Sequence, residues 1–127
     1  MRSAIGELVR ALRPGDTLPQ NQAGVLGLLV REDSARTVAE LADRQRVRHQ
    51  SMARTVALLT EAGLVTQQPH TTDRRKLLVS ATEAGRTALY EQRARREARI
   101  ASAIEARLTS DERETLRTAV ALLRRLP

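Results

Sequence analysis

Residues 37–85 read TVAELADRQRVRHQSMARTVALLTEAGLVTQQPHTTDRRKLLVSATEAG, and the fold class can be predicted from the order of patterns in them. Two short helical patterns come first, each with apolar residues at helical spacing. An apolar strand pattern, a polar loop with a basic end and a second apolar strand pattern follow, and a further helix start closes the stretch. The order therefore predicts a pair of helices followed by a small β-hairpin with a basic tip.

The first half of this stretch carries clear helix signals. Thr37-x-x-Glu40 has the form of a capping box and opens the first helix of the pair. After a polar break at residues 44–48, a second helix is predicted over about residues 49–62, and Gly63 is the expected left-handed cap. The apolar stripe of this second helix must face the core, which leaves its polar side free to meet base edges in a DNA major groove. The side chains predicted to do so are Gln50, Ser51, Arg54 and Thr55.

The second half predicts a hairpin whose tip is basic. Residues 64–65 and 77–79 are the strand candidates, and Asp73, Arg74, Arg75 and Lys76 lie at the turn between them. A narrow minor groove has an enhanced negative potential that attracts arginine. The aspartate is explained if it holds one arginine in a fixed pose by a charge-assisted pair. Together, the helix pair and the hairpin predict a winged helix-turn-helix, mainly α with a small β-hairpin wing.

The charge distribution points to a polyanion as the partner. The 127-residue chain has a net charge of +7, and residues 44–76 hold seven basic side chains against Glu61 and Asp73, so this segment carries +5 of the total. Such a local field favours nucleic acid, and Arg46 and Arg48 are the predicted phosphate contacts. Because aromatic residues make up only 1% of the chain, single-strand binding by base stacking is disfavoured. The prediction is double-stranded DNA.

Other classes of function lack their signatures. Cysteine is absent, and the two histidines are far apart in sequence, so we expect no metal site and no cofactor. No Ser/His/Asp set, phosphate-cradling glycine loop or carboxylate pair suggests an enzyme. No run of about 18 apolar residues predicts a membrane span, and the N-terminus does not have the form of a signal peptide. We therefore expect a cytoplasmic protein that does not contact a membrane.

Helical patterns flank the winged region on both sides. A short helix precedes Pro14-Gly15, a long helix is predicted from about residue 82 to 108, and Thr109-x-x-Glu112 opens a last one. We predict a DNA-binding lobe at 17–81 and a helical dimerisation region made of 1–16 and 82–127. The apolar stripes of these helices need a partner surface, although packing within one chain is an alternative. The predicted interface comprises Ile5, Leu8, Leu12, Ile104, Leu108, Leu116, Val120 and Leu123.

The chain resembles the MarR family of transcriptional regulators over roughly residues 18–126. The motifs that carry the resemblance are Glu40-Leu41-Ala42, Ser51-x-x-Arg54, Leu59, Gly63-Leu64-Val65, Asp73-Arg74-Arg75 and Thr82-Glu83-x-Gly85. The resemblance implies a two-fold dimer on a pseudo-palindromic operator, with the arginine at Arg75 in the minor groove and tied to Asp73. It also implies a small-molecule effector that regulates DNA binding.

Two other hypotheses are compatible with these residues. One is an architectural DNA-binding protein without an effector, which would show little sequence preference. The other is a protein–protein adaptor that keeps the winged fold without binding DNA, and the +5 segment argues against it. The hypothesis that we favour is a homodimeric transcriptional regulator, acting as a repressor, that is released from its operator by a small ligand.

Overall fold

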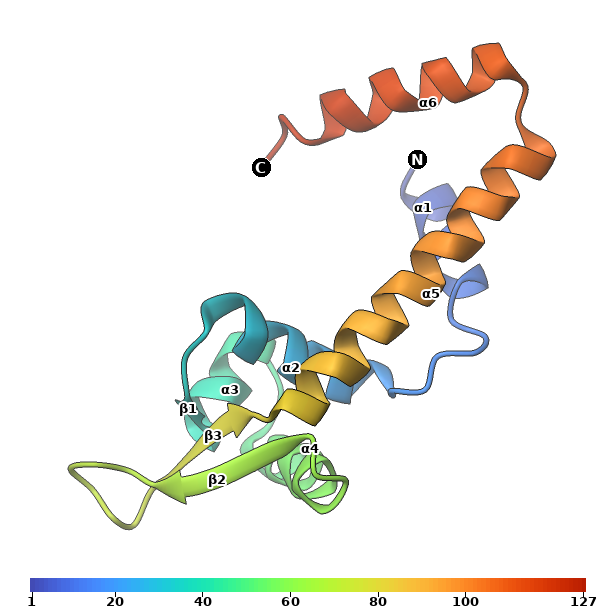
Figure 1. Ribbon diagram of the computed structural model, residues 1–127. Helices are drawn as coiled ribbons and strands as arrows, with labels where there is room; N and C mark the ends of the chain where they lie inside the picture. Colours follow the sequence, from blue (N-terminus) through green and yellow to red (C-terminus); the bar gives the residue numbers. More distant parts are fainter. The chain divides into compact units, whose positions relative to one another are not determined.

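The computed structural model describes residues 1–127 and contains six helices and three short strands (Figure 1). It confirms a mainly α fold with a small antiparallel sheet. In chain order the elements are α1 (Arg2–Ala11), α2 (Gln20–Glu32), β1 (Arg36–Thr37), α3 (Val38–Gln45), α4 (His49–Glu61), β2 (Val65–Pro69), β3 (Leu77–Ala81), α5 (Glu83–Arg107) and α6 (Ser110–Leu123). No helix is both long enough and apolar enough to cross a membrane.

The chain divides into two compact units. Asp16–Arg93 forms one, which we call the winged lobe, and Met1–Gly15 with Ala94–Pro127 forms the other, which we call the helical unit. The predicted division placed its second boundary at residue 82. The compact units divide inside α5, because the first turns of this helix pack onto the core of the lobe through Leu89 and Gln92, and the assignment of DNA binding and dimerisation to separate regions stays a prediction.

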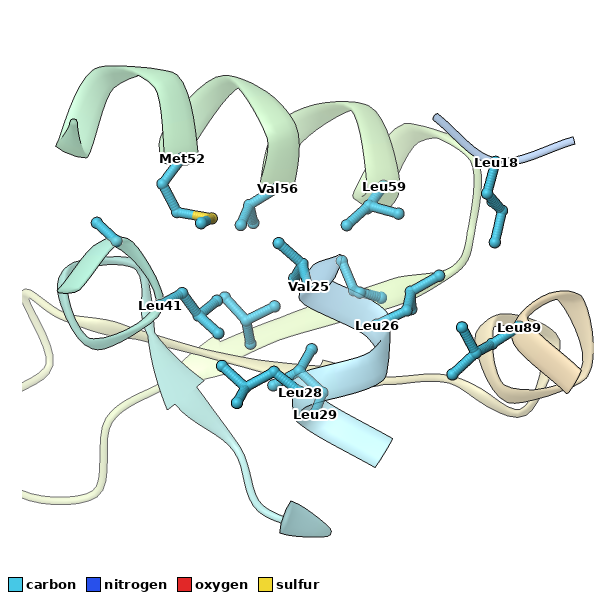
Figure 2. Packing of buried hydrophobic residues seen from close by; sticks show 13 residues of the cluster. Leu18, Val25, Leu26, Leu28, Leu29, Leu41, Met52, Val56, Leu59 and Leu89 are labelled. Atoms are coloured by element: carbon cyan, nitrogen blue, oxygen red, sulfur yellow. The ribbon is translucent and has the colours of Figure 1, made fainter. Parts of the chain in front are cut away.

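The core of the winged lobe is built from α2, α3, α4, the sheet and the start of α5. Figure 2 shows Met52, Val56 and Leu59 pointing from α4 toward the side chains of α2, with Leu41 entering from α3. Helix α2 is the central element, because five successive residues from Val25 to Leu29 are buried. Burial of such side chains is the main stabilising contribution to the lobe, at roughly 1.5–3 kcal/mol each.

The helix ends follow the predicted signals in most places. The Thr37 hydroxyl accepts a hydrogen bond from the Glu40 backbone N–H, and the Glu40 carboxylate accepts one from the Thr37 N–H, which completes the capping box of α3. The Thr37 N–H donor, together with the Arg36 guanidinium, holds the pKa of Glu40 below its usual range. Gly63 has a φ of 74°, the predicted left-handed conformation, just beyond the end of α4.

Two structural details differ from the sequence-based expectation. The sequence Thr17-x-x-Gln20 has the form of a capping box with Thr17 as the N-cap, whereas the N-cap residue of α2 is Pro19, whose side chain cannot cap the helix. The sheet also has a third strand, β1, which pairs antiparallel with β3 in the order β1-β3-β2. A two-residue strand has no hydrophobic periodicity of its own, so only its pairing with β3 reveals it.

The corner between β3 and α5 depends on a glycine. The Thr82 hydroxyl accepts from the Gly85 N–H at 3.1 Å and donates to the Gly63 carbonyl oxygen at 2.7 Å, so it caps α5 and ties it to the end of α4. A Cβ on Gly85 would lie 2.1 Å from the Leu64 carbonyl oxygen, which already accepts from the Thr82 N–H. The helix can therefore approach this loop only because residue 85 has no side chain.

Candidate nucleic-acid interface

The start of α4 is basic and uncapped. Arg48 occupies the N-cap position in an extended conformation, no side chain caps the helix, and its first turn contains no acidic residue. Serine, threonine, aspartate or asparagine is normal at an N-cap, and a cation there opposes the helix dipole. Arg46 lies just before it with a φ of 54°, a left-handed conformation that is uncommon for a residue with a side chain. Arg46 and Arg48 thus contribute little to the stability of α4, and they make its N-terminus well suited to bind an anion.

The outward side of α4 contains three of the four predicted major-groove residues. Gln50, Ser51 and Arg54 are exposed. Thr55 is not: it is 6% exposed, its hydroxyl donates to the Ser51 carbonyl oxygen at 3.0 Å, and it also accepts from the Asn21 side-chain amide at 3.2 Å. The expectation that Thr55 faces outward is wrong, because position 55 lies on the same helical stripe as Met52, Val56 and Leu59.

The wing is a tight loop in which an aspartate holds an arginine. The Asp73 carboxylate accepts from the Arg75 backbone N–H at 3.1 Å and from the Arg75 Nε at 3.3 Å. The predicted pairing of Asp73 with one arginine is therefore confirmed, and that arginine is Arg75. Its side chain remains 93% exposed, so the pair orients the guanidinium without covering it. Arg74 and Lys76 are exposed on the same loop.

The start of α4 and the wing border the same open pocket, of about 320 Å³. His49 contributes from α4, Arg75 and Lys76 from the wing, and Thr37 and Val38 from the start of α3. Figure 1 shows the loop between β2 and β3 extending out from the sheet. The structure therefore brings the first residue of α4 beside two basic residues of the wing, although they are more than twenty residues apart in sequence.

Two polar residues that the sequence analysis missed lie beside the outward side of α4. Asn21 from the first turn of α2 and Gln45 from the end of α3 border a pocket of about 250 Å³ together with Ser51 and Arg54. Polar residues in the first or last turn of a helix are common in any protein, so no sequence signal distinguished them. Their position makes them candidates for further DNA contacts.

One basic residue of segment 44–76, Arg44, forms an ion pair within the winged lobe. The Glu32 carboxylate, at the end of α2, accepts from both Arg36 and Arg44. Arg44 is thereby neutralised locally, and it contributes less to the field at the surface than the net charge of residues 44–76 indicates. All the basic residues of this segment, Arg44 included, are exposed, and the others are Arg46, Arg48, Arg54, Arg74, Arg75 and Lys76.

The helical unit presents apolar side chains that nothing within it covers. Neither α1 nor α6 has a buried residue. A groove of about 670 Å³ runs between α5 and α6, bordered by Ile104, Leu116 and Val120 among others. The predicted interface residues that are exposed in the single chain are Ile5, Leu8, Leu116, Val120 and Leu123, whereas Leu12, Ile104 and Leu108 are half-buried.

Comparison with known proteins decides the family. The MarR family model matches residues 16–76. An HTH-type transcriptional regulator of Mycobacterium tuberculosis is 37% identical over 123 residues, which span 94% of this chain and 85% of the relative. The chain belongs to the MarR family. As the curated relatives of this MarR-family chain are named transcriptional regulators, its classification as a regulator rather than an enzyme is confirmed.

Solved structures agree with this fold assignment. A Pseudomonas aeruginosa protein described as a transcriptional regulator is 34% identical to this MarR-family regulator, with a TM-score of 0.84 over 98% of this chain and 89% of that one. A mutant of S. aureus MepR bound to an oligodeoxyribonucleotide has a TM-score of 0.75 at 14% identity, over 96% of this chain and 91% of that one. At that identity the likeness shows the shared fold alone.

Proposed function

We propose that this chain represses transcription by binding, as a homodimer, to a pseudo-palindromic operator in duplex DNA. One observation carries the proposal: the first residue of the uncapped α4, which follows the exposed Arg48, and the ion-paired Arg75 of the wing border one pocket of the winged lobe. An exposed helix with a free N-terminus suits the major groove and its phosphates. An oriented arginine on a projecting loop suits the neighbouring minor groove.

The proposed division of labour follows from exposure and chemistry. Arg54 can bind guanine through two hydrogen bonds, Gln50 can pair with adenine, and Ser51 suits a base edge or a phosphate. Arg46 and Arg48 contact phosphates. Arg75 enters the minor groove, oriented by Asp73, with Arg74 and Lys76 beside it. Neutralising about 6 to 8 phosphates would give a log–log salt slope of roughly −5 to −7.

The dimer part of the proposal is supported by the helical unit. An amphipathic α6 without a buried residue, next to an apolar groove, is stable only if another surface covers it. A second copy of the same unit offers the same apolar side chains, and two-fold symmetry is the commonest arrangement of such contacts. The expected species is a dimer in sedimentation velocity at micromolar concentration, and a monomer under those conditions would contradict this part.

A selection from random duplex DNA tests the function as a whole. The regulator hypothesis expects an enriched inverted repeat, and transcription in vitro from a template that carries this site should fall when the protein is added. The alternative, an architectural DNA-binding protein, expects salt-sensitive binding without an enriched sequence. Absence of any salt-sensitive DNA binding would instead favour a protein–protein adaptor.

Control by a small-molecule effector is included in the proposal and is supported by family membership. Linkage gives the criterion for a true effector: a ligand that weakens operator binding by some factor must itself bind the operator complex more weakly by the same factor. Titrating a candidate ligand against the free protein and against its operator complex measures both affinities.

Base readout by α4 leads to a prediction for Arg54→Ala. This variant should lose ~1–3 kcal/mol at the guanine that Arg54 contacts, because the two hydrogen bonds discriminate against the other bases. Affinity for a scrambled duplex should fall much less. If operator and scrambled duplex lost affinity equally, Arg54 would be a phosphate contact and not a base contact.

Replacing Arg48 with serine should stabilise the protein and at the same time weaken its binding to DNA. A serine at the N-cap of α4 can accept from the backbone, so the variant should gain up to about 1 kcal/mol in the free energy of unfolding. The same change removes a phosphate contact, which should weaken binding to all duplexes alike and reduce the salt slope by about 1. Urea unfolding and binding titrations at several salt concentrations measure the two effects, and a destabilised variant would contradict the N-cap assignment.

A further inference from the structure

His70 lies at the base of the wing, and its ring is bonded to the loop. Its Nδ1 lies 3.2 Å from the Thr72 backbone nitrogen and 3.3 Å from the Asp73 backbone nitrogen, both of which donate to it. The Thr72 hydroxyl is a third neighbour at 3.1 Å. A ring nitrogen can accept from these two N–H groups only when it carries no proton, so the contacts assign the ring proton to Nε2.

This arrangement has the geometry of an Asx-turn made by a histidine. In such turns the side chain of an Asn or Asp accepts from the backbone two residues ahead and so stabilises the turn. Here the imidazole Nδ1 takes the place of the Asn Oδ1. The His70 backbone also closes the hairpin, because its N–H donates to the Lys76 carbonyl oxygen at 2.9 Å. His70 therefore holds the loop at both its backbone and its ring.

The bonds of His70 lead directly to the wing arginine. Its ring accepts from the Asp73 N–H, and the Asp73 carboxylate in turn accepts from the backbone N–H and the Nε of Arg75. Arg75 is 93% exposed, so this short chain of hydrogen bonds is the restraint that the structure shows on its guanidinium. Fixing that group before binding reduces the entropy that is lost when it enters a groove.

We propose that His70 is a positioning residue of the wing: its ring, acting as an acceptor at Nδ1, fixes Asp73 and through it the pose of Arg75. The effect on DNA binding rests on the proposed function, whereas the effect on the wing itself does not. Three replacements separate the acceptor from the ring. His70→Asn keeps an acceptor at nearly the same place, His70→Gln moves it one bond farther out, and His70→Ala removes it.

The first measurement uses the free protein in NMR. The ¹⁵N shifts of the wild-type imidazole should show the proton on Nε2, and the Thr72 and Asp73 amides should exchange slowly. Exchange should accelerate about five- to tenfold in His70→Ala and His70→Gln, and His70→Asn should restore it, since one such hydrogen bond is typically worth that factor. Thr71→Ala, at the exposed neighbouring position, is the matched control and should leave both amides unchanged.

The second measurement is the affinity for the selected duplex. Affinity should fall about five- to tenfold in His70→Ala and His70→Gln and return to within about twofold in His70→Asn. Loss in all three variants would show that the ring itself is needed and would overturn the acceptor role, as would unchanged exchange in His70→Ala. If exchange follows the prediction while no variant alters the affinity, His70 does position the wing, and it is the proposed contact of the wing with DNA that fails.

Discussion

Replacing Arg75 with alanine should weaken operator binding about 100-fold and leave the dimer intact. The Arg75 guanidinium is fully available at the tip of the wing and is oriented by Asp73. A hydrogen bond to a charged group contributes roughly 1.5–3 kcal/mol, and a two-fold dimer places two wings on one duplex, so a loss of at least ~3 kcal/mol is expected. Fluorescence anisotropy with a labelled operator measures the affinity, and sedimentation velocity checks the dimer.

Two variants test separately the planar shape of the Arg75 side chain and its ion pair with Asp73. Arg75→Lys keeps the charge but loses the planar fork and the Nε contact with Asp73, so it should recover only part of the affinity. Asp73→Asn keeps the size of residue 73 but removes its charge, and it should weaken binding although it makes the protein more positive. An operator affinity that does not change in Arg75→Ala would rule out the minor-groove role of the wing.

Replacing Gly85 with alanine should cost the winged lobe about 3 kcal/mol or more in the free energy of unfolding. The new Cβ would lie 2.1 Å from the Leu64 carbonyl oxygen and 3.0 Å from Leu26 Cδ2. Neither a backbone oxygen nor a side chain in a close-packed core can move freely, so α5 must shift away from the lobe. Alanine's higher helix propensity offsets at most about 1 kcal/mol of this loss.

Gly63→Ala is the matched comparison in the same lobe. Gly63 has a positive φ of 74°, but nothing lies within 4 Å of the Cβ that it would gain. Its replacement should therefore cost only the backbone strain of a left-handed alanine, about 1–2 kcal/mol. Urea unfolding of both variants gives the difference, and equal losses would mean that α5 can move away from Leu64 at little cost.

Much of the winged lobe could be predicted because its signals are local. A capping box joins residues three apart, a helical stripe repeats every three or four residues, and a left-handed cap requires glycine. These signals located α3 and α4, while the strand patterns and the basic turn located the wing, where an aspartate beside arginines predicted their pairing. The outward positions of Gln50, Ser51 and Arg54 followed from the stripe on the opposite side of the same helix.

The helix pair, the basic wing and the family motifs could be found in the sequence, because each depends on neighbours along the chain. The features that the sequence did not predict arise from contacts in the tertiary structure. The Thr55 hydroxyl accepts a hydrogen bond from Asn21 of α2, and β1 exists only through its pairing with β3. Arg44 is neutralised by a glutamate from α2, and Gly85 is required by a carbonyl group twenty-one residues away. Such contacts join segments distant in sequence, and no local periodicity encodes them.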